Sequence, residues 1–193
     1  MKLLGTVGLP GSGKSEAAAV ARAAGVPVVT MGDVIRDECR NRGLDPAQHH
    51  GEMAKTLREE GGPGAIAKRS LPEIESALSE SASETALVDG LRSPAEVDRF
   101  EAAFGDAFVL VSVEAPFETR AERLADRERD ASDADREALR DREERELGFG
   151  MGDVMDRADV RIENTGSLAA FRERIRGLLD VPATPELEAK RDR

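Results

Sequence analysis

The sequence has few of the residues on which several large classes of protein depend. It contains one cysteine, no tryptophan and no tyrosine, and aromatic residues make up 3% of the chain. A single cysteine, Cys39, cannot form an internal disulfide bond, so we expect it to be a small buried helix residue. No apolar run approaches the roughly 18 residues of a membrane-spanning helix. The chain must therefore be held together by an ordinary hydrophobic core.

Positive charge is also in short supply. The chain carries 39 acidic and 28 basic residues, and its formal net charge is −11. A nucleic-acid-binding surface favours the opposite sign, so we expect no nucleic-acid partner. The composition resembles that of salt-adapted archaeal proteins, and we predict that added salt screens the repulsion and stabilises the fold. The segment MKLLGTVGL is too short an apolar run for a signal peptide, so we expect a cytoplasmic protein with no membrane partner.

The chain does have a regular alternation of short apolar runs and amphipathic stretches. Its 193 residues are enough for one domain with a hydrophobic core. The β-branched and apolar runs predict strands at 2–7, 26–30, 85–88, 107–113 and 159–162. The intervening stretches predict helices at 14–24, 33–42, 47–60, 65–78, 94–104, 116–129, 136–147 and 167–179. This alternation predicts an α/β fold: an open, doubly wound parallel sheet covered by helices on both faces, with ligands at the carboxyl ends of the strands.

A glycine-rich loop between the first predicted strand and the first predicted helix carries the clearest chemistry. It reads GLPGSGKS and fits the pattern G-x-x-x-x-G-K-[ST] in full. Its residues are Gly8, Leu9, Pro10, Gly11, Ser12, Gly13, Lys14 and Ser15. The glycines let successive backbone N–H groups point inward at an anion, and the helix that follows adds its positive end. Lys14 suits the β- and γ-phosphates and Ser15 suits Mg²⁺, so the loop predicts ATP with Mg²⁺ as the bound cofactor.

A carboxylate at the end of the third predicted strand supports this interpretation. Asp89 follows the run ETALV, where P-loop proteins hold Mg²⁺ directly or through water. Many P-loop hydrolases place a glutamate directly after this aspartate to activate water, but here Gly90 follows. The guanine-reading tetrapeptide N-K-x-D of GTPases is absent from the sequence. Both observations favour phosphoryl transfer over a motor ATPase or a GTPase switch.

Two segments resemble the acceptor-binding motifs of adenylate kinases. TMGDVIR, at 30–36, is similar to their T-G-D-x-x-R segment, and DGLR, at 89–92, is similar to their D-G-[FY]-x-R segment. The resemblance implies that Arg36 and Arg92 grip the phosphate of an acceptor, and that Asp33 orients the first loop or the water shell of Mg²⁺. Arginine offers a planar fork that matches phosphate oxygens, which agrees with this role. The helices at about 32–80 are then the acceptor-binding part.

Kinases of this type carry a lid that closes over the triphosphate, and the resemblance places it at about 120–147. Arg120, Arg123 and Arg127 fall on one face of a predicted helix, before an acidic break at 130–135. We choose Arg123 and Arg127 as the lid residues that reach the phosphates. Further on, ADVRIENTG resembles the A-D-x-x-I-x-N-x-G segment of dephospho-coenzyme A kinases, which implies that Asn164 and Gly166 touch the adenine.

Two smaller features are less specific. His49 and His50 stand on a polar helix start without evident metal-ligand partners, so we expect both to be solvated. The run GGPG at 61–64 is either a hinge between acceptor-pocket helices or an ordinary loop.

Taken together, the chain resembles a family of archaeal P-loop proteins related to adenylate kinases, over residues 1–180. GLPGSGKS, MGDVIR, REEGGPGAIAK, DGLRS and ELGFGMG carry the likeness. It implies a three-layer α/β/α P-loop NTPase fold, a five-stranded parallel sheet of order 2-3-1-4-5, a helical lid, and a charged flexible tail at 181–193. The chain departs from true adenylate kinases in having Ser15-Glu16 after the lysine.

The leading hypothesis from the sequence is an ATP-dependent kinase of a small phosphorylated acceptor, most of all a nucleotide or a nucleotide-like molecule. One alternative is an enzyme like dephospho-coenzyme A kinase, whose hydroxyl acceptor needs a base, for which Asp33 is the candidate. The other is a non-catalytic or slowly hydrolysing ATP-binding module that acts through a partner.

Overall fold

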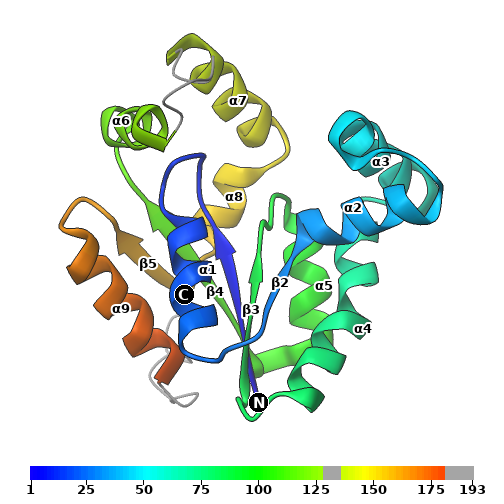
Figure 1. Ribbon diagram of the computed structural model, residues 1–193, viewed down its shortest axis with the longest axis horizontal. Helices are drawn as coiled ribbons and strands as arrows, with labels where there is room; N and C mark the ends of the chain where they lie inside the picture. The colour runs from blue at the N-terminus through cyan, green and yellow to red at the C-terminus, as the bar shows by residue number, and fades with distance from the viewer. Residues whose placement is uncertain (128–135, 181–193) are drawn as a thin grey trace.

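The computed structural model describes residues 1–127 and 136–180 of the chain (Figure 1). Five parallel strands form one sheet in the order β2-β3-β1-β4-β5. The strands are β1 (Lys2–Val7), β2 (Val28–Thr30), β3 (Thr85–Asp89), β4 (Phe108–Glu114) and β5 (Val160–Glu163). The predicted strand order is confirmed. The predicted acidic break at 130–135 and the charged tail at 181–193 lie outside the described residues.

Helices cover both faces of the sheet, as predicted. They are α1 (Lys14–Ala23), α2 (Met31–Asn41), α3 (Pro46–Gly61), α4 (Ala65–Glu80), α5 (Pro94–Phe104), α6 (Phe117–Arg127), α7 (Arg136–Gly148), α8 (Met151–Asp156) and α9 (Leu168–Asp180), with a 3₁₀ turn η1 (Gly105–Ala107). One apolar cluster joins the sheet to α1 and α9, and a second joins it to α2, α3, α4, α5 and α8. Helices α3, α6 and α7 stand beyond the carboxyl edge of the sheet (Figure 1). None of the helices in the described part is long and apolar enough to cross a membrane.

The central strand β1 shows why these residues form the core. All six of its residues are buried, and alternate side chains point to opposite faces, so Leu3 and Leu4 enter different apolar clusters. Gly5 has no side chain because the rings and branches of Phe108 and Leu91 occupy that place; a Cβ there would lie 2.7 Å from both. Cys39 of α2 is fully buried in the larger cluster, which confirms the expectation for it.

The register of the sheet brings the motif-bearing segments to one edge. In a parallel sheet all strands end on the same side, and here Thr6 of β1 lies opposite Asp89 of β3, which also lies opposite Thr30 of β2. The loop after β1, the segment after β3 and the start of α2 therefore meet at this edge. On the other side of β1, Glu114 of β4 lies opposite Glu163 of β5, so the segment after β5 ends there too.

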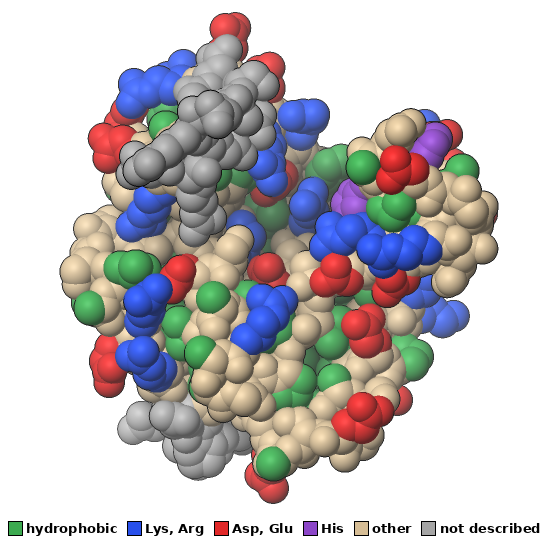
Figure 2. Space-filling view, viewed as in Figure 1, with side chains coloured by type: hydrophobic (Ala, Val, Ile, Leu, Met, Phe, Trp, Pro, Cys, Tyr) green, Lys and Arg blue, Asp and Glu red, His purple; other side chains and the backbone are tan. Residues whose placement is uncertain are grey.

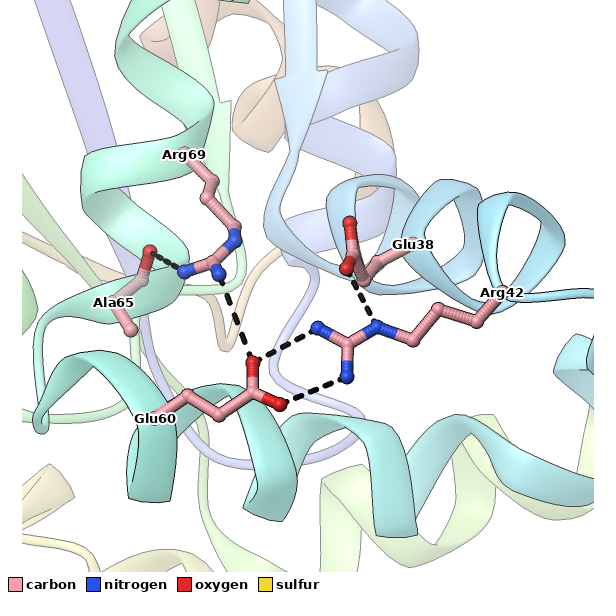
Figure 3. A network of polar contacts seen from close by, with 5 residues as sticks. All are labelled: Glu38, Arg42, Glu60, Ala65 and Arg69. Atoms are coloured by element: carbon pink, nitrogen blue, oxygen red, sulfur yellow. Dashed lines mark hydrogen bonds and ion pairs between the residues drawn. The ribbon is translucent and has the colours of Figure 1, made fainter.

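A surface ion-pair network fixes the arrangement of α2, α3 and α4 (Figure 3). Arg42, at the end of α2, donates two hydrogen bonds of 2.9 and 2.8 Å to Glu60 of α3 and one of 2.7 Å to Glu38. Arg69 of α4 reaches the same Glu60 carboxylate at 4.0 Å and donates to the carbonyl of Ala65. The Arg42 hydrogen bonds lower the pKa of Glu60. One carboxylate thus connects the three helices α2, α3 and α4.

Candidate functional site

The glycine loop between β1 and α1 has positive φ angles, which favour glycine, at three places: Gly8, Gly11 and Gly13. Gly8 and Gly13 have φ angles of 148° and 120°. A Cβ on Gly8 would lie 2.2 Å from the carbonyl oxygen of Val113, and one on Gly13 would lie 2.5 Å from the side-chain nitrogen of Asn164. The loop therefore packs tightly against the ends of β4 and β5, with the N-terminus of α1 directly behind it.

Lys14 lies half-buried beside the glycine loop. Its ammonium group donates hydrogen bonds to the carbonyls of Gly8 and Leu9, within the loop itself. Burial, together with the charges of Arg92 and Arg142, lowers the pKa of Lys14 to about 8, although the carboxylates of Glu146 and Asp89 act in the opposite direction. An anion in the loop would restore the charged form of this lysine. This is the electrostatic setting expected of a phosphate site.

Two oxygen-bearing residues beside Lys14 could hold a divalent cation. Asp89 ends β3 and accepts a 2.8 Å hydrogen bond from the hydroxyl of Thr6, which fixes one carboxylate oxygen and leaves the other available. Ser15 is exposed in the first turn of α1. Carboxylate and hydroxyl oxygens suit Mg²⁺, which keeps several waters and phosphate oxygens as its other ligands. Within residues 1–127 and 136–180, no group of three His, Cys, Asp or Glu forms a metal cage.

The predicted acceptor residues of α2 form a close pair. Arg36 donates two hydrogen bonds, of 2.9 and 2.6 Å, to one carboxylate oxygen of Asp33. The two side chains are 40% and 50% exposed, so the guanidinium is oriented but open to a ligand. In this geometry Asp33 holds Arg36 in position, whereas the sequence interpretation placed Asp33 beside the first loop or the water shell of Mg²⁺.

Arg92 lies after β3 and is held through its backbone. Its N–H donates a 2.8 Å hydrogen bond to Glu96, which is almost fully buried at the start of α5. Arg58 of α3 approaches the same carboxylate at 3.4 Å. Burial raises the pKa of Glu96, and the Arg92 backbone and the Arg58 charge act against this rise. Sequence reasoning missed Glu96, although Ser93 and Glu96 have the S-x-x-E spacing in which the glutamate reaches back to a backbone N–H at the start of the helix.

The predicted lid arginines have different positions on α6. Arg123 donates a 2.8 Å hydrogen bond to the carbonyl of Asn164 and reaches the carbonyl of Ser12 at 3.5 Å, so it lies against the glycine loop. Arg120, which sequence reasoning did not choose, is 3% exposed; it donates to Pro10, Ala115 and Glu143. The side chain of Arg127 lies outside the described part of the structure.

A pocket of about 450 Å³ lies beside the glycine loop, where the segment after β5 approaches it. Its lining residues are Gly11, Gly13, Glu16, Arg123, Asn164, Gly166 and Leu168. Gly166, which the resemblance implies as an adenine contact, is one of the residues that border this space. Asn164 is buried, and its side-chain nitrogen donates a 2.8 Å hydrogen bond to the carbonyl of Ser12. The structure therefore places the Asn164 amide against the loop backbone as a support.

Two further residues enter the site that sequence reasoning did not select. Glu146 of α7 is buried, and Arg142, one turn earlier, approaches it at 3.6 Å; both charges act on Lys14. They stand in a helix of alternating Arg and Glu, so no sequence signal separates them from surface pairs.

The prediction of two solvated histidines is wrong for one of them. His49 pairs with Glu52 at the surface, but His50 has a buried ring nitrogen without a hydrogen bond.

Basic side chains gather around a hollow at this edge of the molecule. Figure 2 shows lysine and arginine side chains on both sides of the hollow that separates the α2–α3 helices from the α6–α7 part. The protein as a whole is strongly acidic, so this local concentration of positive charge favours an anionic ligand.

The fold and the loop together define a P-loop protein of the kinase-like type. The sequence of residues 7–140 matches the AAA domain family. The chain belongs to the UPF0200 family of archaeal proteins. It is 61% identical to a UPF0200 protein of Halobacterium salinarum, over 95% of this chain and 96% of that protein. It is 43% identical to one of Methanosarcina mazei, over 97% and 99% respectively.

Solved structures share the fold at low sequence identity. TT1252 from Thermus thermophilus superimposes with a TM-score of 0.66 at 22% identity, covering 92% of this chain and 96% of that one. A shikimate kinase from Bacteroides thetaiotaomicron gives 0.54 at 16% identity, covering 93% and 99%. These likenesses confirm the predicted P-loop kinase fold, and the relatives from Halobacterium salinarum and Methanosarcina mazei confirm the predicted archaeal family.

Proposed function

We propose that this protein is a cytoplasmic, ATP-dependent phosphotransferase that moves the γ-phosphoryl group to a nucleotide or nucleotide-like phosphate acceptor. Lys14 and the amides of the glycine loop hold the β- and γ-phosphates, and Ser15 and Asp89 hold Mg²⁺. When bound, Mg²⁺ neutralises phosphate charge and orients the transferred group. Arg36 and Arg92 bind the acceptor phosphate on the opposite side of the hollow.

The observation that carries this proposal is that Arg92 lies between Lys14 of the glycine loop on one side and Arg36 and His50 on the other, close enough for its charge to act on both sides. Its charge acts on Lys14 in the glycine loop and also on His50 of α3, whose pKa Arg36 lowers as well. Lys14, Arg92 and Arg36 thus form a connected row of positive charge from the donor loop to the acceptor helices. Two phosphate groups placed along this row would be held near each other, which is the positioning that phosphoryl transfer requires.

The region around 120–147 is proposed as the lid over the donor. Arg123 already lies at the rim of the pocket beside Gly166, and closure of α6 and α7 would bring Arg123, Arg127 and Arg142 toward the phosphates and exclude water. The adenine is proposed to enter this pocket, with Asn164 supporting the loop. A phosphate monoester acceptor is itself a nucleophile at neutral pH, so this reaction needs no general base.

The test is ADP release from Mg-ATP in high potassium chloride across a panel of acceptors: AMP, CMP, UMP, GMP, dephospho-coenzyme A, shikimate and no acceptor. The proposal expects one phosphorylated acceptor to raise the rate well above the blank and to yield its phosphorylated product. An equal slow rate in every well, the blank included, contradicts the proposal and favours the ATP-binding module that acts through a partner.

A second candidate is transfer to a hydroxyl acceptor, as in an enzyme like dephospho-coenzyme A kinase. The buried carboxylate of Glu146, close enough to act on the charge of Lys14, favours it, because a hydroxyl acceptor needs a base near the γ-phosphate. Asp33 is less suited to that role, since it is already bonded to Arg36. Turnover of dephospho-coenzyme A or shikimate in the panel, lost in Glu146→Gln, would identify this reaction.

A further inference from the structure

His50 is a polar side chain within the acceptor half of the site that has no role in the proposed function. It lies on α3, and its ring nitrogen Nε2 is buried with no hydrogen bond of ordinary length and angle, although the backbone of Gly32 lies close enough to act on the ring. A buried nitrogen of this kind costs free energy unless a ligand satisfies it. Its neighbour His49 differs, since it faces the surface and bonds to Glu52 of the same helix at 3.3 Å.

The space in front of His50 is defined by the absence of a side chain on Gly32. A Cβ on Gly32 would lie 3.6 Å from Nε2 of His50 and 3.4 and 3.5 Å from the two terminal nitrogens of Arg36. Three nitrogens from two helices therefore surround one small space beside the start of α2. Nitrogen donors converging on a small space suit the oxygens of an anion.

Burial and the charges around His50 both disfavour its charged imidazolium form in the free protein. Burial lowers the pKa of His50, and the cations that face it, Arg36 of α2 and Arg92 after β3, lower it further; the backbone of Gly32 acts in the opposite direction. The nearest acid on α2, Asp33, is engaged by Arg36. A phosphate dianion bound to the two arginines would reverse the local field and favour the imidazolium form.

We propose that His50 is a third ligand of the acceptor phosphate and takes up a proton when a phosphate dianion binds between Arg36 and Arg92. The inference rests on the proposed function and narrows it: the acceptor carries a phosphate monoester, whose second negative charge the imidazolium neutralises. An acceptor that presents only a hydroxyl or a carboxylate leaves the positive charge in this space less well compensated.

The sequence makes the test direct, because the chain has two histidines in all. Their ring resonances are followed by NMR as a function of pH and assigned with the His49→Gln variant. The full-length protein is saturated with Mg²⁺ and β,γ-methylene-ATP to fill the glycine loop. It is then titrated in inorganic phosphate and, separately, in potassium chloride of equal ionic strength. We expect phosphate to raise the pKa of His50 by about one unit or more, and that of His49 hardly at all.

A kinetic measurement distinguishes a role of His50 in binding the acceptor from a purely structural role. With the acceptor found in the panel, KM for that acceptor should rise with pH in the wild type and in His49→Gln. In His50→Gln the pH dependence should be lost, and KM at pH 6 should be about tenfold higher, with a smaller effect on kcat.

The two hypotheses fail separately. If His50 keeps the same pKa in phosphate as in chloride, the inference is overturned, whatever the panel shows. If no acceptor in the panel raises ADP release, the proposed function fails on its own measurement.

Discussion

The proposed donor half of the site, around the glycine loop, and the proposed acceptor half, around Arg36 and His50, hold their cations in different ways. Around the glycine loop, Arg120 and Arg123 donate to carbonyls of the loop itself, and Lys14 does the same. In the acceptor half, Arg36 bonds to the half-exposed Asp33. Each half also has a buried polar atom without a hydrogen bond, Oγ of Ser12 in the glycine loop and Nε2 of His50 on α3.

This difference indicates which half is preorganised. The donor loop is fixed by buried hydrogen bonds before any nucleotide arrives, so its geometry costs little to complete. The acceptor half is an open arrangement of charges on helices that are tied together mainly by packing and the Arg42–Glu60 network. We therefore expect changes in the donor half to affect both folding and binding, and changes in the acceptor half to affect acceptor binding and turnover much more than folding.

The largest effect is expected from Lys14→Met. Loss of this charge removes the group that neutralises the β- and γ-phosphates, so acceptor-dependent turnover should fall by about 10³-fold or more. Lys55→Met is the matched control, because Lys55 is exposed on α3 and pairs with Glu59. Turnover of Lys14→Met within tenfold of the control would contradict the donor assignment.

The next effect separates the two halves. Arg36→Ala should lower acceptor-dependent turnover by about 100-fold while leaving Mg-ATP affinity, measured by calorimetry, unchanged. Arg40→Ala, one turn further along α2 and paired with Asp37 at the surface, should keep both quantities. An Arg36→Ala enzyme with normal turnover would remove the acceptor role and support the ATP-binding module.

Arg120→Met tests whether the donor half is structural as well as functional. It leaves Glu143 without its partner and frees the carbonyl of Pro10, so the free energy of unfolding should fall by about 3 kcal/mol in urea titrations. Arg140→Met on α7, whose guanidinium lies over the Phe117 ring, should cost much less. Equal losses in the two variants would show that the Arg120 contacts do not stabilise the loop.

The pKa of Lys14 gives a pH dependence of defined sign. It is about 8 in the folded protein, against 10.5 for an ordinary lysine. Between these values the unfolded chain binds the extra proton, so the free energy of unfolding should rise with pH in this window, by up to about 1.4 kcal/mol per unit. Lys14→Met should lack this rise. Mg-ATP binding favours the charged lysine, so its affinity should fall as pH passes 8.

The smallest expected effect comes from Gly32→Ala. The methyl group improves helix propensity in α2, so stability should be unchanged or rise by up to about 1 kcal/mol. The same methyl enters the space between Arg36 and His50, so KM for the acceptor should rise several-fold. Gly51→Ala on α3, where a Cβ meets nothing within 4 Å, provides the control for propensity alone.

The sequence predicts the fold and the donor loop well because their signals are local. Strand runs such as FVLVSV and the glycine loop specify their own backbone, and chain alternation specifies a parallel sheet. The sequence does not predict roles that depend on the orientation of a side chain. Asn164 turns inward to the carbonyl of Ser12, and Arg120 is buried although it sits in a charged helix. His49 and His50 are adjacent in sequence, and only the helix face decides which one enters the site.

The buried thiol of Cys39 can be used to measure how often α2 opens. The sulfur is fully enclosed by the larger apolar cluster, and it is the one cysteine in the chain. A thiol reagent can therefore attack it only during moments when α2 lifts from the cluster, and the labelling rate counts those openings. A ligand that bridges Arg36 on α2 to Arg92 beside the sheet would keep the helix down, so slower labelling becomes an assay for acceptors that needs neither turnover nor a chromophore.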